Sequence, residues 1–255
     1  MRLWVWVGLL LLAGCASLPE KTPPVDEGLL RTRYEEDQRQ RREEVLSWEV
    51  GGILDLESEE TGERRVRITS SGVWGQWGRM EVIGPFQQLM RVVTFDATRL
   101  TLLDPPGKRG VMQTPSARGL ASLTGIAVDP FRFQDLLLAG GGALQTLNGQ
   151  EGEWLSRDGE HLVLDGVTGR ILSRRGATSG SEPYRVDYLW PEVSRKPGVV
   201  LPDRLTITWG KANRLKVRFA NWQTDASPRT PPVPATITVP DDFRADPSSL
   251  ADQDS

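Results

Sequence analysis

The stretch LPDRLTITWGKANRLKVRFANW, residues 201–222, decides the fold of this chain. Apolar residues occupy alternate positions in both of its halves, namely Leu205, Ile207 and Trp209, then Leu215, Val217 and Phe219. Successive side chains of a β-strand point to opposite faces, so each half presents one apolar and one polar face. Residues 210–214 form a short polar segment suited to a turn. The stretch therefore predicts an antiparallel hairpin with one buried apolar face and one solvent-exposed polar face.

The same two-residue period recurs in many short segments of the chain. Besides the hairpin, it predicts strands within residues 48–58, 63–71, 78–84, 90–95, 100–103, 153–159, 160–166, 168–175 and 184–190. Asp-Gly pairs at residues 158–159 and 165–166 provide turns, and glycine (26) and proline (18) are plentiful. Short strands joined by turns indicate an antiparallel sheet of hairpins, so the predicted fold class is mainly β, of α+β type.

Two helical segments interrupt the predicted sheet in the middle of the chain. Residues 116–126, SARGLASLTGI, predict a short helix that Ser116 can cap. In residues 129–142, DPFRFQDLLLAGGG, Asp129 can cap a second helix and Pro130 suits its first position, while three glycines end it. Its apolar residues cover more than one narrow stripe, so we expect this helix to lie buried over the sheet.

The N-terminus predicts export and lipidation. One arginine and ten mostly apolar residues, Leu3–Leu12, have the shape of a secretory signal peptide and are too short to span a membrane. Residues 12–15, Leu-Ala-Gly-Cys, resemble the lipobox of bacterial lipoproteins, which implies cleavage after Gly14 and acylation of Cys15. An ordinary signal peptide with an incidental cysteine is the alternative. Cys15 is the only cysteine, so we expect no internal disulfide.

These features divide the chain into a lipoprotein signal peptide (1–14), a lipidated tether (15–28), one domain (29–225) and a C-terminal extension (226–255). The extension holds one possible strand, ATITV at residues 235–239, followed by a disordered acidic end. At the start of the domain, residues 31–46 alternate charges and contain few apolar residues, which predicts a solvated helix. Ala16 and Ser17 follow the cysteine in place of an aspartate that would resemble an inner-membrane retention signal, so the outer membrane is favoured.

Little in the sequence supports catalysis. His161 is the only histidine, in a strand-like segment beside a turn, and with one cysteine it predicts no zinc site. Neither a phosphate-binding Gly-x-x-x-x-Gly-Lys-Ser/Thr loop nor a Gly-x-Ser-x-Gly elbow occurs, so we expect no enzyme, no cofactor and no metal. A net charge of −3 argues against a nucleic-acid partner. An envelope hydrolase with two carboxylates in a cleft stays an alternative.

Four segments resemble the LolB family, the outer-membrane receptors of bacterial lipoprotein sorting. The stretch 201–223 resembles its closing hairpin, which ends in Asn-Trp as Asn221-Trp222 do here. EVIGPFQQLMRV (81–92) resembles its Gly/Asn-Pro-apolar loop, and LTGIAVDPFRFQDLLLAG (123–140) resembles its helical segment. Trp48 stands where the family opens its first strand with a tryptophan. The resemblance spans residues 45–224 in the same order.

This resemblance implies an incomplete antiparallel β-barrel of eleven strands, whose apolar concave face is lidded by short helices. It further implies a monomer, anchored by its lipid and facing the periplasm, that takes the acyl chains of client lipoproteins from a periplasmic LolA-like carrier. Phe86, held out by Pro85, would be the loop residue that helps insert them into the outer membrane. The family typically has leucine followed by glycine at this loop, where this chain has Phe86 followed by Gln87.

The residues expected to face an acyl chain are large and apolar: Trp48, Phe131, Leu137, Trp209, Phe219 and Trp222. For Trp209, Phe219 and Trp222, alternation does not distinguish a cavity wall from a packed core, so both interpretations stay open. A structural or assembly lipoprotein on the same scaffold, without transport, is the main alternative function. In that case side chains should fill the interior and the Phe86 loop should be packed.

Overall fold

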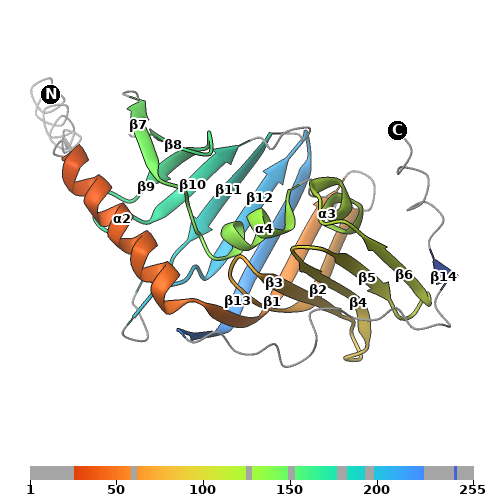
Figure 1. Cartoon of the computed structure of the whole chain (residues 1–255). Helices are drawn as coiled ribbons and strands as arrows, with labels where there is room; N and C mark the ends of the chain where they lie inside the picture. Colours follow the sequence, from red (N-terminus) through yellow and green to blue (C-terminus); the bar gives the residue numbers. More distant parts are fainter. Residues whose placement is uncertain are drawn as a thin grey trace, which may run out of the picture.

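The structure, a computed structural model, describes residues 26–58, 62–124, 128–148, 153–176, 183–192, 198–226 and 244–245 (Figure 1). Its strands join one 14-stranded sheet in the order β14-β6-β5-β4-β3-β2-β1-β13-β12-β11-β10-β9-β8-β7. Neighbouring strands are antiparallel, except that β14 (Arg244–Ala245) runs parallel to β6. The described sheet is an open barrel, so the predicted mainly β fold with an incomplete antiparallel barrel is confirmed. Cys15 and the possible strand at 235–239 lie outside the described residues.

The first half of the sheet is an up-and-down meander that starts at its centre. It consists of β1 (Ser47–Ser58), β2 (Gly62–Val73), β3 (Trp77–Ile83), β4 (Leu89–Asp96), β5 (Leu100–Asp104) and β6 (Arg109–Gln113). The eleven strands that the resemblance implies are too few, because β6, β7 and β14 extend the sheet at its ends. The sequence of β6, RGVMQ, has little apolar alternation, which is why its strand was not predicted.

The second half of the sheet returns from the far edge to the centre. It consists of β7 (Leu144–Asn148), β8 (Glu153–Ser156), β9 (His161–Leu164), β10 (Ile171–Gly176), β11 (Tyr184–Leu189), β12 (Arg204–Trp209) and β13 (Asn213–Asp225). The predicted hairpin is β12–β13, with Leu205 opposite Val217. Since β13 also pairs with β1, this hairpin joins the two halves of the sheet.

Two short helices cross the inner face of the sheet, as expected. They are α3 (Ala117–Thr124) and α4 (Pro130–Leu137), and they connect β6 to β7 from one end of the sheet to the other. The Ser116 hydroxyl accepts a hydrogen bond from the Gly119 N–H at 3.0 Å, and Asp129 caps α4 through the Phe131 N–H at 2.9 Å. Both predicted caps therefore form. Figure 1 shows α3 and α4 lying in front of the sheet.

The helix α2 (Glu27–Glu44) packs along the second half of the sheet (Figure 1). The prediction of a solvated helix holds for its outer face, where Arg39 pairs with Glu36 and Glu43, but is wrong for the other face. Its buried residues are Leu30, Tyr34, Gln38 and Arg41. Two of these are polar, so the buried face leaves no apolar period in the sequence. No helix in the described parts of the chain combines the length and apolarity needed to cross a membrane.

Candidate functional site

The inner face of the sheet, which we define as the face toward α3 and α4, is largely apolar. At its centre Val217 faces both Leu54 and Leu205 across the neighbouring strands, and Leu205 also faces Tyr188. Val217 and Leu205 are buried. Burying a side chain of this size contributes about 1.5–3 kcal/mol to folding, so packing on this face stabilises the domain.

A small cavity lies between the inner face and the two helices. Its volume is about 10 Å³, which is room for about one water molecule. The cavity is lined by Trp48, Ser70, Gly78, Arg79, Met80, Val93, Phe95, Leu120, Phe133, Gln134 and Leu137. Three of these belong to α4, so α4 would have to move before an acyl chain could enter at this place.

Three of the predicted cavity residues lie at or beside this cavity. Trp48 and Leu137 line it, and both are buried. Phe131 packs edge-on against Phe95, with ring centroids 5.4 Å apart, and Phe95 lines the cavity. The start of β1 and the helix α4 thus bring these aromatic and leucine side chains together from distant parts of the sequence.

The other three predicted residues are outside the cavity lining. Trp209 is buried opposite Tyr184 on the next strand. Phe219 and Trp222 lie 4.8 Å apart, and the Trp222 indole N–H donates a hydrogen bond to the Pro202 carbonyl at 3.1 Å. None of the three lines the cavity itself, but Trp222 packs against Trp48, which does, with ring centroids 6.3 Å apart.

Side-chain hydrogen bonds fix α4 to the turn between β2 and β3. The Trp74 indole N–H donates to Asp135 Oδ1 at 2.8 Å, and the Gln134 amide donates to the Trp77 carbonyl at 2.7 Å. A Cβ on Gly78 would lie 2.5 Å from the Phe95 ring and 2.9 Å from the Gln134 amide nitrogen, so glycine leaves the room that both side chains need here. These contacts tie α4 to the first half of the sheet.

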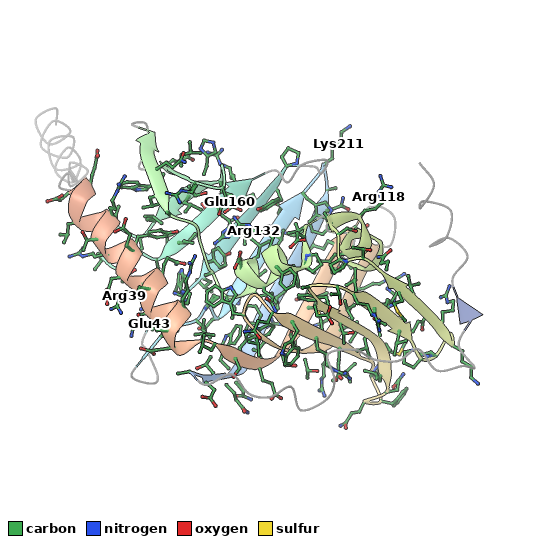
Figure 2. All side chains as sticks on the ribbon, in the orientation of Figure 1. Arg39, Glu43, Arg118, Arg132, Glu160 and Lys211 are labelled. Atoms are coloured by element: carbon green, nitrogen blue, oxygen red, sulfur yellow. The ribbon has the colours of Figure 1, made fainter. Side chains whose placement is uncertain are left out.

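A buried cluster of charges fixes α4 to the second half of the sheet. Arg132 of α4 forms an ion pair with Glu160 in the β8–β9 turn (Figure 2). Arg174 lies 3.5 Å from the same carboxylate, and the Tyr184 hydroxyl donates to it at 2.5 Å. Burial opposes ionisation of Glu160, but Arg174, Arg132 and Tyr184 hold its pKa below the usual value. Glu160 therefore stays charged near neutral pH and bridges α4 to the sheet.

Side chains from neighbouring elements also donate hydrogen bonds to the backbone carbonyl groups at and just after the end of α4. The Tyr188 hydroxyl donates to the Leu136 carbonyl at 2.9 Å, and burial raises the pKa of Tyr188 to about 12, which keeps this donor protonated. Arg174, which is fully buried, donates to the Gly140 carbonyl, and Gln38 of α2 donates to the Ala139 carbonyl at 3.2 Å. Polar contacts from three directions therefore hold the segment in its closed position.

The loop between β3 and β4 carries the exposed Phe86. The Gly84 and Gln88 backbones are hydrogen-bonded at 2.9 Å, and the Phe86 N–H donates to the Gln88 side chain at 2.9 Å. Phe86 is nevertheless 89% exposed, and Pro85 beside it is exposed too. Figure 1 shows the β3–β4 hairpin reaching beyond the rest of the sheet. An ordered turn thus presents a large apolar side chain to solvent.

Gln87, which departs from the family's loop pattern, keeps a glycine-like backbone conformation. Gln87 has φ of 58°, in the left-handed region that glycine adopts most easily. The resemblance places glycine at this position. The turn conformation that glycine would favour is therefore kept, although the residue differs.

Sequence reasoning missed the charged cluster and most of the cavity lining. Met80, Val93 and Phe95 lie on predicted strands, and pairing β3 with β4 would have placed Met80 opposite Val93 on the inner face. Arg174 gave no such signal. A bulge between Ile171 and Ser173 shifts the alternation of β10, so Arg174 shares the inner face with Ile171. Simple alternation assigns it to the solvent-exposed polar face.

The carboxylates near α4 lie beside guanidinium groups. Among the described residues, no group of three or more histidine, cysteine, aspartate or glutamate side chains could hold a metal ion. Asp135, Asp158 and Glu160 lie 3.9 Å or closer to Arg132, and Glu160 also lies 3.5 Å from Arg174. His161 is partly exposed and lies 3.7 Å from Glu153, which agrees with the structural role that the sequence suggests.

The class of protein is defined by three features: an open antiparallel half-barrel, an apolar inner face, and a helical crossover that covers this face. Solved structures of this class include a DUF1329 family protein from Desulfovibrio piger, with a TM-score of 0.55 and 9% sequence identity over 77% of this chain and 93% of that one. A LolA superfamily protein from Nitrosomonas europaea has a TM-score of 0.50 and 9% identity, over 75% of this chain and 93% of that one.

The chain has the LolA/LolB-type fold. The sequence itself matches no family model and no curated protein. At 9% identity the two similar structures show the fold alone, so the function has to be argued from the cavity, the helix that closes it and the Phe86 loop.

Proposed function

We propose that this chain is a lipoprotein of the outer membrane, anchored through acylated Cys15, that receives acyl chains of lipoproteins from a periplasmic carrier and passes them to the membrane. One observation carries the proposal: Phe86 is 89% exposed on an ordered turn at the end of a strand that borders the cavity. Exposed Pro85 stands beside Phe86, and Leu89, at the base of the same loop, is 37% exposed, so the hairpin end presents an apolar surface suited to an apolar partner.

The strand β3 offers a direct path between the cavity and the loop. Met80 lines the cavity, Val82 is the next residue on the inner face and is half-buried, and Phe86 follows in the loop. At about 3.3 Å per strand residue, Met80 and Phe86 are at most about 20 Å apart. An acyl chain that leaves the cavity along β3 would therefore reach the exposed phenylalanine.

The energetics suit a transient acyl-chain site. An acyl chain with over a dozen methylenes is less favourable in water by on the order of 10 kcal/mol, at about 0.8 kcal/mol per methylene. Half-buried apolar residues continue the inner face beyond the cavity: Leu54, Leu56, Val66 and Val82. Opening α4 would join these residues to the cavity wall and so provide a dry groove.

The test is transfer of an acylated lipoprotein from its periplasmic carrier to the chain from residue 15 onward with Cys15→Ala, detected by native mass spectrometry. We expect transfer to this chain and its delivery to vesicles, and we expect Phe86→Glu to abolish delivery. Ala97→Glu places the same charge in the exposed β4–β5 turn and should leave delivery unchanged. Equal delivery by both variants would contradict the role of Phe86.

The small cavity favours a second candidate, a structural or assembly lipoprotein without transport. Side chains leave only about 10 Å³ beneath α4, as a packed scaffold would have. The two candidates differ in lipid content. If neither acyl transfer nor any co-purifying lipid is found, the scaffold function is the better account.

A further inference from the structure

A row of cross-strand partners crosses the outer face of the sheet, which is the face away from α3 and α4. The pairing registers connect its members one to the next, over seven neighbouring strands: Leu89, Ile83, Arg67, Ile53, Arg218, Arg204 and Leu189. We call this set the arginine row. It begins at Ile83 and Leu89, the two residues from which the Phe86 loop extends.

The three arginines of the row are exposed and have no ionic partner. In the described part of the chain, no ion pair or side-chain hydrogen bond involves Arg67, Arg204 or Arg218. Carboxylates near the row are engaged by other cations: Asp55 with Arg65 at 3.3 Å, Glu57 with Lys216 at 3.1 Å, Glu81 with Arg79 at 2.8 Å and Asp187 with Arg185 at 2.8 Å. The positive charge of the row is therefore not neutralised within the sheet.

The arrangement of these arginines is unfavourable for the isolated protein. Arg204 and Arg218 lie directly opposite one another on β12 and β13, and like charges in that position destabilise a sheet. Arg67 is two strands from Arg218, or about 10 Å at the usual strand spacing. Stability alone does not explain such a row, whereas an anionic surface would compensate it.

The residues around the arginines indicate what kind of surface this is. Leu89 and Leu189 at the ends of the row are 37% and 53% exposed, and Ile53 and Ile83 are half-buried. Exposed apolar residues mixed with arginine fit a phospholipid interface, where the apolar groups enter the acyl region and guanidinium groups bind phosphate.

We propose that the arginine row binds anionic phospholipid headgroups and so directs the Phe86 hairpin to a negatively charged leaflet. This rests on the proposed function, since it assumes that Phe86 faces the membrane. It adds the lipid class that the protein prefers and the residues that recognise it. A lysine or arginine near an anionic membrane contributes about a fivefold gain in affinity, so three of them contribute about a hundredfold.

The test is flotation of the Cys15→Ala chain, from residue 15 onward, with two kinds of vesicle. One is phosphatidylcholine alone, and in the other one third of the lipid is phosphatidylglycerol. We expect binding to the anionic vesicles to be much the tighter, and to weaken in high salt. The triple variant Arg67→Gln, Arg204→Gln, Arg218→Gln should lose about a hundredfold on anionic vesicles and little on neutral ones.

A matched control removes three exposed arginines elsewhere, with Arg39→Gln, Arg157→Gln and Arg175→Gln. It has the same net charge as the triple variant and should keep most of the anionic binding. Equal binding of the wild type and the triple variant to anionic vesicles would overturn the proposal. So would a triple variant that keeps its vesicle binding but loses transfer from the carrier, since the row would then bind an acidic protein.

The inference and the proposed function can fail separately. If the wild type prefers anionic vesicles through the row but accepts no acyl chain, the inference stands and the transfer function falls. If acyl transfer occurs and the preference for anionic vesicles is absent, the transfer function stands and the inference about the arginine row falls. The triple variant of the row should melt at or slightly above the wild type, because it removes the Arg204–Arg218 repulsion. The control variant should melt slightly below the wild type, because it removes the exposed ion pairs of Arg39 and Arg175.

Discussion

Glu160→Gln should release α4 from one half of the sheet at a measurable loss of stability. Glu160 is 4% exposed and lies between Arg132 of α4 and the fully buried Arg174. Glutamine keeps the size of the side chain and an oxygen that can accept from Tyr184, so the change removes chiefly the charge. Removing one partner of a buried ion pair costs about 3–5 kcal/mol, because the remaining charge is uncompensated.

The expected loss is large enough to measure by thermal unfolding. For a domain of this size each kcal/mol lowers the melting temperature by about 2–4 °C, so Glu160→Gln should lower it by about 6–20 °C. The control is Glu43→Gln on the outer face of α2, which removes an exposed partner of Arg39 and should cost less than about 1 kcal/mol. Circular dichroism melts of the three proteins at neutral pH provide the comparison.

The same substitution should also make the inner face easier to open. If the closed position of α4 loses stability relative to the open one, a fluorescent fatty acid should bind more tightly to Glu160→Gln than to the wild type. The reasoning would be refuted by a melting temperature within about 2 °C of the wild type, which would mean that the cluster contributes under about 1 kcal/mol. A lower melting temperature of Glu160→Gln with unchanged fatty-acid binding would refute only the link between the charged cluster and the opening of α4.

Three further predictions concern pH, packing and the loop. The pKa of Glu160 is lowered in the folded protein, so its stabilisation is complete above the ordinary value of about 4.3 and is lost as the pH falls through the lowered pKa. The gap in melting temperature between wild type and Glu160→Gln should therefore narrow below about pH 4.3 and close once the pH is below the lowered pKa. Gly78→Ala should lower stability by about 1–3 kcal/mol in urea unfolding, since the new methyl group would overlap the Phe95 ring. Gln87→Gly should raise stability by up to about 1 kcal/mol, because glycine adopts the positive φ of this turn without strain.

The sequence was sufficient for the sheet where apolar and polar residues alternate. The hairpin of β12 and β13 shows why: Leu205, Ile207, Leu215 and Val217 each have polar neighbours on both sides, so only one register buries all four. The helix caps at Ser116 and Asp129 were predicted for a similar reason, since a short polar side chain directly before a helix satisfies its free N–H groups.

The buried polar contacts could not be predicted from the sequence. Arg41 and Arg174 are fully buried, yet each lies in a run of charged residues that is typical of a solvated face. Arg41 has one local partner, Asp37, but it also donates to the distant Leu138 and Val200 carbonyls. Arg174 contacts the Gly140 carbonyl and the distant Glu160, and no local pattern indicates these distant contacts. The closed position of α4 depends on these contacts, so the state of the cavity was equally beyond prediction.

A transfer protein without a nucleotide must release its cargo by affinity alone, and the closed α4 gives a physical reason why release would be favourable. Binding an acyl chain beneath α4 would gain on the order of 10 kcal/mol of apolar burial. It would also have to break the contacts from α4 to Trp77 and Trp74 on one side and to Glu160 on the other. A bilayer offers the same apolar burial without that cost, so in the proposed function the acyl chain would pass to the membrane once Phe86 has brought the protein to it. Weakening the contacts of α4 should therefore slow delivery even while it strengthens binding, and a variant such as Glu160→Gln that loads faster but delivers more slowly would be the signature of this mechanism.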